Sequence, residues 1–203
     1  MGGLTPIVLA AGASTRMGRP KALLDFDGRA CLDLVLDSVR AAGRTVVVLG
    51  PNHEEIRRRV DLGAVDVELN LDVDGGQTAS LQAALRRLPA DVDAFLFMPV
   101  DLPLLRAADV DTLLQSRIAN PGSSLYIPSH AMKRGHPILC DRKLAAEFLA
   151  LPPGASARDV VNRVPGRIAY VDFVEAYLLM DMDTPEDYRR CLEAFRAREA
   201  RSR

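Results

Sequence analysis

A loop near the start of the chain gathers residue types that suit the binding of a triphosphate. The stretch LAAGASTRMGRPK, residues 9–21, follows an apolar run and combines small residues with an arginine and a lysine. Small residues let the backbone approach a ligand closely, and successive N–H groups can form a nest for phosphate oxygens. Arg16 can donate two parallel hydrogen bonds to a phosphate, and Lys21 adds a compact positive charge. We therefore expect this loop to hold the pyrophosphate part of a nucleotide.

Two better-known phosphate loops do not fit this stretch. A P-loop requires GxxxxGK followed by Ser or Thr, but the spacing between Gly12 and Gly18 is too long and Lys21 lies too far beyond. A dinucleotide loop requires GxGxxG, and Ser14 stands where the second glycine should be. A glycine-rich connection with incidental cations is the alternative that these residues leave open.

Carboxylates that could bind a metal follow two other segments. Asp101 comes shortly after the apolar run Ala94–Met98, so its carboxylate is expected at the end of a buried strand. Mg²⁺ prefers one or two carboxylates together with phosphate oxygens and water. Asp101 is therefore the expected Mg²⁺ ligand, and Asp181 or Asp183, at the end of the alternating run YLLMDMD, is the expected second one. The alternatives are an Asp101 that caps a helix near Ala107 and acids at 181 and 183 that serve only a helix start or a solvated loop.

Two further segments carry polar residues that suit a substrate. Residues 75–81 place small residues, an amide and hydroxyls before a helical pattern, so Gly76, Thr78 and Ser80 are expected beside a base and ribose. The alternative is a flexible glycine turn with Thr78 as an ordinary N-cap. In RGHP, Arg134 with its neighbours Gly135 and His136 could bind the phosphate of an acceptor, although a single histidine is more often structural.

These residues must be positioned by alternating strands and helices. Short apolar runs rich in Val, Ile, Leu and Phe predict strands covered on both faces. The expected strands are Pro6–Leu9, Thr45–Leu49, Val65–Leu69, Ala94–Met98, Ser124–Ile127 and Ile168–Val171. The alternation predicts an α/β fold, a three-layer sandwich with a mainly parallel, Rossmann-like sheet, and ligands bind beyond the carboxyl ends of such strands. We expect one domain over residues 1–203, in which 132–165 could form a lobe facing the substrate.

The helical segments are marked by periodicity and by capping residues. In 78–88, apolar residues recur at the spacing of one helix face. The last helix is the best marked, since Thr184 is a natural N-cap and Pro185 suits the first helical position. Its apolar face is Tyr188, Cys191, Leu192 and Phe195, and we expect fraying after Arg196.

Composition excludes several classes of function. The 203 residues are 48% hydrophobic and 26% charged with a net charge of −1, which is typical of an ordinary globular chain rather than a nucleic-acid binder. No apolar run approaches the roughly 18 residues of a membrane span. The three cysteines are far apart and without a CxxC pair, so neither disulfides nor a zinc site is expected. A cytoplasmic location is the simplest expectation.

The motifs together resemble a known family. LAAGxSxRMGxxK is similar to the signature of nucleotidyltransferases, and the remaining segments resemble the molybdenum cofactor cytidylyltransferase branch, one of the molybdopterin nucleotidyltransferases. The resemblance rests on LAAGASTRMGRPKALL (9–24), GGQTASLQAAL (75–85), PVDLPLL (99–105) with RGHPIL (134–139), and MDMDTPEDY (180–188), which span nearly the whole chain. Gln77, Thr78 and Ala79 depart from it, because serines are common there in the family.

The resemblance implies a reaction and a set of site residues. It implies transfer of CMP from CTP to the terminal phosphate of molybdopterin, giving molybdopterin cytosine dinucleotide and pyrophosphate, with Mg²⁺ as cofactor. An apo molybdenum hydroxylase and its chaperone would be partners. GTP or UTP with another phosphorylated acceptor, such as a sugar phosphate, is an alternative, and a non-catalytic nucleotide-binding regulator is a more distant one. The implied nucleotide contacts are Leu9, Ala10, Ala11, Gly12, Ser14, Arg16, Gly18, Lys21, Gly76, Thr78, Ser80 and Asp101, with Arg16, Lys21 and Asp101 catalytic.

Overall fold

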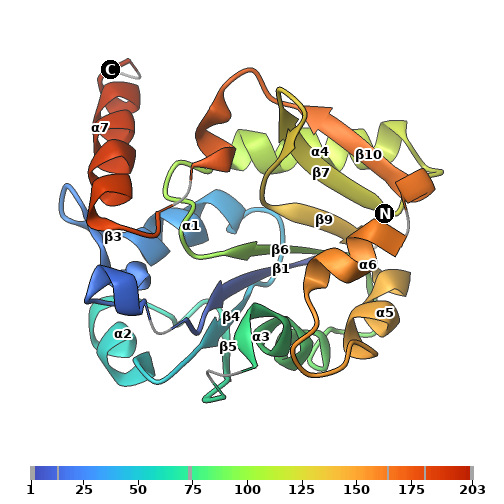
Figure 1. Ribbon diagram of the computed structural model, residues 1–203, viewed down its shortest axis with the longest axis horizontal. Coiled ribbons are helices and arrows are strands. Elements are labelled where there is room, and N and C mark those ends of the chain that lie inside the picture. The colour runs from blue at the N-terminus through green and yellow to red at the C-terminus, as the bar shows by residue number, and fades with distance from the viewer. Residues whose placement is uncertain (1–2, 13, 73–74, 164, 181, 202–203) are drawn as a thin grey trace.

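A single large sheet runs through the molecule, as the computed structural model shows (Figure 1). The structure describes residues 3–12, 14–72, 75–163, 165–180 and 182–201. The strands lie in the order β10 (Ile168–Asp172), β7 (Leu125–His130), β9 (Ile138–Asp141), β6 (Val92–Pro99), β1 (Gly3–Ala10), β4 (Val46–Leu49) and β5 (Asp66–Leu69), and β8 (Lys133–Arg134) pairs with β7. Only β8 and β9 run antiparallel to their neighbours among these strands, so the expected mainly parallel α/β sheet is confirmed.

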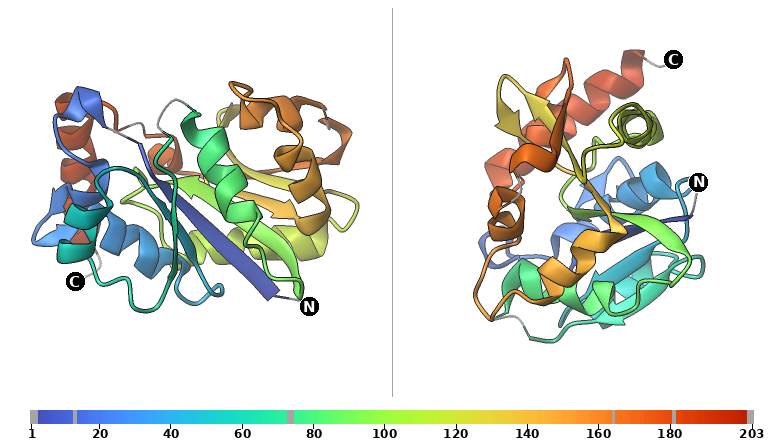
Figure 2. Two further views of the ribbon diagram at one scale, coloured as in Figure 1. Left: turned by 90° about the horizontal axis from the view of Figure 1, so that it is seen from below. Right: turned by 90° about the vertical axis from the view of Figure 1, so that its right-hand side faces the viewer.

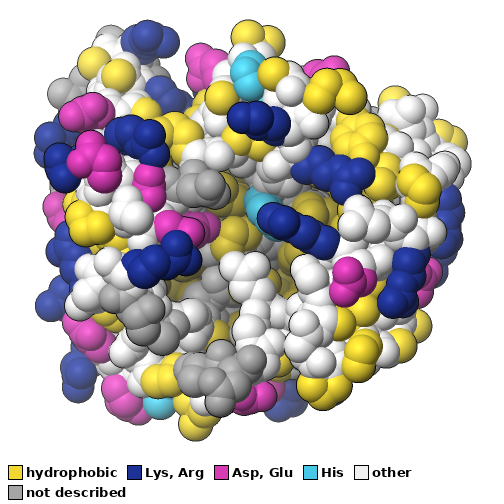
Figure 3. Space-filling view, viewed as in Figure 1, with side chains coloured by type: hydrophobic (Ala, Val, Ile, Leu, Met, Phe, Trp, Pro, Cys, Tyr) yellow, Lys and Arg dark blue, Asp and Glu magenta, His cyan; other side chains and the backbone are white. Residues whose placement is uncertain are grey.

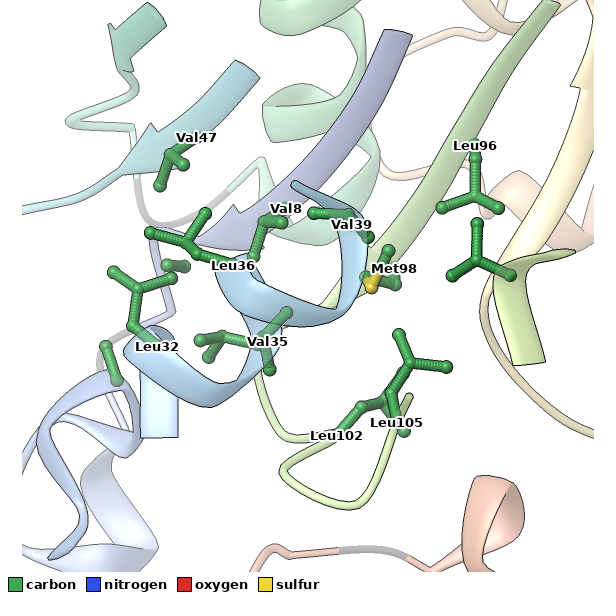
Figure 4. Close-up of a cluster of buried hydrophobic side chains, with 14 of the residues drawn as sticks. Val8, Leu32, Val35, Leu36, Val39, Val47, Leu96, Met98, Leu102 and Leu105 are labelled. Carbon is green, nitrogen blue, oxygen red and sulfur yellow. The ribbon is translucent and has the colours of Figure 1, made fainter. Parts of the chain in front are cut away.

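Helices cover both faces of this sheet, which makes the three layers (Figure 2). One face packs against α1 (Cys31–Val39), α2 (His53–Arg59) and α4 (Ala107–Ala119), and the other against α3 (Gly76–Leu85), α5 (Ala145–Leu149) and α6 (Ala157–Arg163). In β1 the side chains alternate between the layers: Val8 belongs to the first core, while Ile7 and Leu9 belong to the second. The period of two follows from the pleat of a strand. Figure 4 shows the first core, with Val8, Val35 and Met98 among its members.

The last helix, α7 (Pro185–Arg201), packs against a small hairpin of β2 (Asp25–Phe26) and β3 (Arg29–Ala30) rather than against the large sheet. Phe26 is fully buried and meets the rings of Tyr188 and Phe195 edge-on, at centroid distances of 5.6 and 5.5 Å. The Tyr188 hydroxyl donates to the carbonyl of Asp25. The hairpin follows the loop 9–21 in the chain, so its packing against α7 holds the segment just after that loop in place.

The chain order places a crevice between β1 and β6. These two strands are neighbours, yet from β1 the chain moves outward to β4 and β5, and β6 lies on the other side. A sheet of this kind binds ligands beyond the carboxyl ends of the strands at such a switch point. The N–H of Val100 donates to the carbonyl of Leu9 at 3.1 Å, so the segments that leave the two strands stay together. The loop 9–21 and Asp101 both lie at this edge of the sheet, where β1 and β6 end.

The predicted strands and helices agree with the structure except in two places. The run 177–183 was expected to end a strand, but Ala176–Leu179 forms a 3-10 helix. The final helix does not fray after Arg196 and continues to Arg201. The alternative readings of two site residues do not apply. Thr78 is not an N-cap, because α3 already begins at Gly76. Asp101 does not cap α4, since Arg106 stands at the N-cap of that helix and the Asp101 carboxylate accepts from Lys21 instead.

The segment 132–165 is partly built into the sheet. Its residues 138–141 form β9, which is inserted between β6 and β7, and the remainder includes β8, α5 and α6. Within the part of the chain that the structure describes, no helix has the length and apolar character needed to cross a bilayer.

Candidate active site

A cavity of about 300 Å³ opens at the carboxyl ends of β1 and β6. Figure 3 shows a hollow near the middle of this face of the molecule, with acidic, basic and histidine side chains around it. Segments that are distant in the sequence meet at the cavity because parallel strands end at the same edge. It is lined by Leu9, Ala10, Ala11, Gly12, Ser14, Arg16, Met17, Pro20, Lys21, Ala22, Asp72, Gly76, Gln77, Ser80, Pro99, Val100, Asp101 and Asp183.

Lys21 lies at the centre of the charged part of this cavity. Its Nζ donates to Asp101 Oδ2 at 2.7 Å and to Asp183 Oδ1 at 2.6 Å. Arg16 Nη1 lies 3.2 Å from the other oxygen of Asp183. Burial alone would lower the pKa of Lys21, but the pairing with Asp101 and Asp183 outweighs it and raises that pKa. The hydrogen bond from Lys21 lowers the pKa of Asp183. Lys21 and Asp183 therefore stay charged near neutral pH.

The loop around Lys21 is held by local hydrogen bonds and by a close approach. Ser14 has a φ of 51°, and its Oγ accepts the N–H of Lys21 at 3.1 Å. The loop then makes two short 3-10 turns, at Thr15–Met17 and Lys21–Leu23. On the other side, Gly50 at the end of β4 lies so close to Ala11 that a Cβ at Gly50 would come within 2.2 Å of the Ala11 carbonyl oxygen. The backbone of the loop is therefore fixed from two sides.

Asp183 is positioned by the start of α7. The Asp187 carboxylate accepts hydrogen bonds from the N–H of Asp183 at 3.3 Å, the N–H of Thr184 at 2.9 Å and the Thr184 hydroxyl at 2.7 Å. The N–H of Asp187 in turn donates to Thr184 Oγ1 at 3.2 Å. The predicted N-cap at Thr184 is therefore confirmed, and Asp187 makes it reciprocal. It orients the backbone of Asp183, whose side chain points to Lys21.

The opposite wall of the cavity is made by the start of α3 and the segment before it. Gly76 has a φ of 63°, which glycine adopts without strain. Ser80 is buried, its hydroxyl donates to the Gly76 carbonyl at 3.3 Å, and it accepts from Asn70 Nδ2 at 3.0 Å. Asp72 accepts the N–H of Gly75 at 3.1 Å. This wall therefore offers polar groups across from Lys21.

The expected acceptor-binding residues form a separate group beside the cavity. Arg134 donates to the hydroxyl of Tyr170 and to Asn162 Oδ1, the latter at 3.1 Å, and its guanidinium lies 5.4 Å from the Tyr170 ring centre. Gly135 packs so tightly that a Cβ there would come within 2.7 Å of the Leu178 carbonyl oxygen. The ring of His136 meets the ring of Phe97 at 6.2 Å. The side chain of Arg134 is exposed, whereas Gly135 is set in place by its neighbours.

The donor set fits a divalent cation. The carboxylates of Asp101 and Asp183 converge on one position, which the Lys21 ammonium occupies. The cavity beside them leaves room for phosphate oxygens. That composition is the one Mg²⁺ prefers. Among the described residues there is no group of three or more His, Cys, Asp or Glu placed to hold a metal. Asp181, the other expected ligand, lies outside the described residues.

The structure brings most of the predicted site residues to one cavity. Of the expected nucleotide contacts, Gly18 and Thr78 do not line it: Gly18 occupies a turn at φ 68°, and Thr78 is buried in α3. Arg134, Gly135 and His136 are also not part of its lining. The lining residues that sequence reasoning missed are Met17, Pro20, Ala22, Asp72, Pro99 and Val100. Asp72 had a usable signal, because it follows the strand Asp66–Leu69 at the same edge of the sheet.

Known proteins resemble this chain in sequence and in fold. The profile of a family described as "MobA-like NTP transferase domain" matches residues 6–168. A nicotine blue oxidoreductase from Paenarthrobacter nicotinovorans is 30% identical over 197 residues, which cover 93% of this chain and 96% of that protein. A molybdenum cofactor cytidylyltransferase from Escherichia coli K12 is 27% identical over 198 residues, 96% of this chain and 98% of that one.

Among solved structures, Rv0371C from Mycobacterium tuberculosis H37Rv, in complex with manganese, superposes with a TM-score of 0.74. It is 30% identical, and the match covers 95% of this chain and 99% of that one. The likeness therefore extends over nearly the whole fold.

Proposed function

Because the chain belongs to the MobA-like NTP transferase domain family, we propose that it transfers CMP from CTP to the terminal phosphate of molybdopterin, releasing pyrophosphate. The observation that carries this proposal is the meeting of Lys21, Asp101 and Asp183 at the cavity between β1 and β6. These residues come from three distant parts of the chain and supply the charges that phosphoryl chemistry requires.

The reaction needs no protein nucleophile. An oxygen of the acceptor phosphate attacks the α-phosphorus of CTP, the bond from that phosphorus to the bridging oxygen breaks, and pyrophosphate leaves with the electron pair. The acceptor oxygen is already anionic, so no general base is required. Positioning and charge neutralisation then account for catalysis.

Each charged residue has a role that follows from its place. Arg16 and Lys21, next to the backbone of the small-residue loop, bind the β- and γ-phosphates and stabilise the departing pyrophosphate. Asp101 and Asp183 would hold Mg²⁺, which when bound supplies neutralisation of charge on the phosphate oxygens. Gly76 and Ser80 line the opposite wall, where base and ribose are expected. Arg134, with Gly135 and His136, is proposed to contact the acceptor.

The choice of CTP and molybdopterin rests on similarity. The relative named molybdenum cofactor cytidylyltransferase matches over nearly its whole length. Ala11 in LAAG resembles the cytidylyl branch, where the guanylyl branch has LAGG, and sugar-phosphate uridylyltransferases share LAAG. An apo molybdenum hydroxylase and its chaperone are the partners proposed on the same basis. GTP or UTP with another phosphorylated acceptor is the competing assignment within the same reaction class.

The deciding experiment measures pyrophosphate release from each of CTP, GTP, UTP and ATP, with Mg²⁺ and with molybdopterin or a panel of sugar phosphates. We expect release with CTP and molybdopterin, and its loss in Asp101→Asn, which removes one carboxylate charge with little change of shape. Asp141→Asn is the matched control, since Asp141 pairs with Arg117 away from the cavity. Release with another pair would move the assignment to another branch, and binding without any release would indicate a nucleotide-binding regulator.

A redox reaction is the second candidate, and the relative named nicotine blue oxidoreductase is the observation that favours it. The same protein preparation tests it directly. NADH and NADPH are mixed with quinone-type dyes, and absorbance at 340 nm is followed. Oxidation of the nicotinamide that survives Asp101→Asn, together with no pyrophosphate release, would replace the transferase proposal.

A further inference from the structure

We propose that Lys21 holds the place of a divalent cation in the nucleotide-free protein, so that metal binds tightly only together with the triphosphate. This inference rests on the proposed function, because it takes Asp101 and Asp183 as the metal ligands. It adds an order of binding to that site and gives Lys21 a second role besides phosphate contact.

The first observation is the position of the ammonium group. Lys21 Nζ lies 2.7 Å from Asp101 Oδ2 and 2.6 Å from Asp183 Oδ1. A cation bound by these two oxygens would lie between them, which is where Nζ already is. Two positive charges cannot share this place, because their repulsion rises steeply at such short distances. Metal and ammonium therefore compete for the same pair of carboxylates.

The second observation is that the charges of the site already cancel. Lys21 and Arg16 contribute two positive charges, and Asp101 and Asp183 contribute two negative ones. The side chains of Lys21 and Asp101 are only 16% and 18% exposed, so solvent screens the charges of this pair weakly. A divalent cation added alone would leave two uncompensated positive charges in the cavity, whereas a triphosphate brings negative charges that match them.

The third observation is that Lys21 has another partner to move to. Its N–H is anchored by Ser14 Oγ, but the four-carbon side chain is flexible and lines the cavity. Phosphate oxygens in the cavity offer the ammonium new acceptors. Arg16, whose side chain is 71% exposed, can likewise turn from Asp183 to phosphate. The triphosphate would thus free both carboxylates as it binds.

A different role for Lys21 predicts the opposite result. If the ammonium only holds Asp101 and Asp183 in register for the metal, its removal would let the carboxylates separate and would weaken metal binding. If it competes with the metal, its removal strengthens metal binding in the nucleotide-free protein. The sign of the change therefore decides between the two roles.

The experiment measures binding of Mn²⁺ to the nucleotide-free protein from the electron paramagnetic resonance signal of free Mn²⁺. Lys21→Met keeps most of the length of the side chain and removes its charge. We expect Lys21→Met to bind Mn²⁺ at least about tenfold more tightly than the wild type, a change of about 1.4 kcal/mol. Lys143→Met is the matched control, because Lys143 also pairs with an aspartate, Asp141, but is exposed and outside the cavity lining. It should bind Mn²⁺ like the wild type.

Two further measurements secure the interpretation. In the double variant Lys21→Met with Asp101→Asn the gain should disappear, and in the wild type a CTP analogue with a non-hydrolysable α,β-bridge should tighten Mn²⁺ binding. Unchanged or weaker binding by Lys21→Met, a gain that persists without Asp101, or tight binding by the nucleotide-free wild type would each overturn the proposal. Pyrophosphate release by the wild type is scored separately, so a failed transferase assignment can be told apart from failed competition at the carboxylates.

Discussion

A methyl group added at Gly50 should displace the loop 9–21 without itself contacting a bound nucleotide. Gly50 directly follows β4 and lies against Ala11 in the loop 9–21. A Cβ there would come within 2.2 Å of the Ala11 carbonyl oxygen and 2.9 Å of the Ala11 Cα. Both atoms belong to the backbone, so no side chain can rotate to relieve the clash, and Ala11 must move.

The magnitude follows from the overlap. Forcing an extra methyl into a well-packed site typically costs about 1–3 kcal/mol. For a chain of this length that corresponds to a fall in melting temperature of roughly 2–12 °C. The shift passes directly to Ala11 and Gly12, which line the cavity. A displacement on the order of 1 Å in a positioning segment can cost about 100-fold in rate, so the loss of turnover should exceed what the loss of stability explains.

The assay compares Gly50→Ala with Gly122→Ala. A Cβ at Gly122 would have no heavy atom within 4 Å, so that variant should match the wild type. Thermal melts with and without Mg²⁺–CTP give the loss of stability and the loss of nucleotide binding from one sample, and pyrophosphate release gives the rate. A Gly50→Ala protein with unaltered melting temperature, nucleotide shift and rate would refute the close approach of β4 to the loop.

Three other predictions address the frame around the site. Burial and the bond to Asp109 raise the pKa of Tyr177 to about 12; the unfolded chain loses this proton near pH 10, so the stability should fall between pH 10 and 12, by at most about 2 kcal/mol. Urea unfolding across that range should show a flatter profile for Tyr177→Phe, and an unchanged slope would contradict the shift. Phe26→Ala should lower the free energy of unfolding by about 3–5 kcal/mol, because it empties the contact between the hairpin and α7; a loss below about 1 kcal/mol in urea would count against that contact. Thr184→Ala should cost about 1 kcal/mol through loss of the N-cap, seen as a lower melting temperature, and no change would mean that the cap contributes nothing.

The parts of the fold that sequence predicts are those with local patterns. The strands at 94–98 and 45–49 are continuous apolar runs, and the cap at Thr184 is a local motif, so these agree with the structure. The strand Ile138–Asp141 was not expected because four residues with an acidic end carry little periodicity. Its antiparallel place between β6 and β7 depends on pairing between distant residues. The 3-10 helix at Ala176–Leu179 likewise reflects tertiary contacts, among them the bond from Tyr177 to Asp109.

In the candidate site, too, local sequence patterns predict some residues, whereas contacts between distant residues are not predicted. Composition and spacing predict a phosphate-binding role for the loop 9–21 and place Asp101 shortly after a buried strand. They do not indicate that Lys21 pairs with both Asp101 and Asp183, because these partners lie 80 and 162 residues away. Asp72 shows how more of the residues that line the cavity could be predicted from the sequence. Parallel strands end at one edge of the sheet, so the acids that follow each predicted strand are all candidates for the same site.

The distance along the chain between Lys21 and Asp183 also has a consequence during synthesis. A ribosome adds about 5–20 residues per second and N-terminal segments fold first, so β1 and the loop 9–21 are made well before Asp183. During that interval Arg16 and Lys21 lack Asp183, with which both pair in the folded protein. The ring contact between Phe26 and Phe195 likewise forms only after the C-terminal helix has been made. Completion of this charged cluster is therefore tied to translation of the C-terminal helix, and a ribosome stalled before residue 183 would carry a chain whose Arg16 and Lys21 lack this partner.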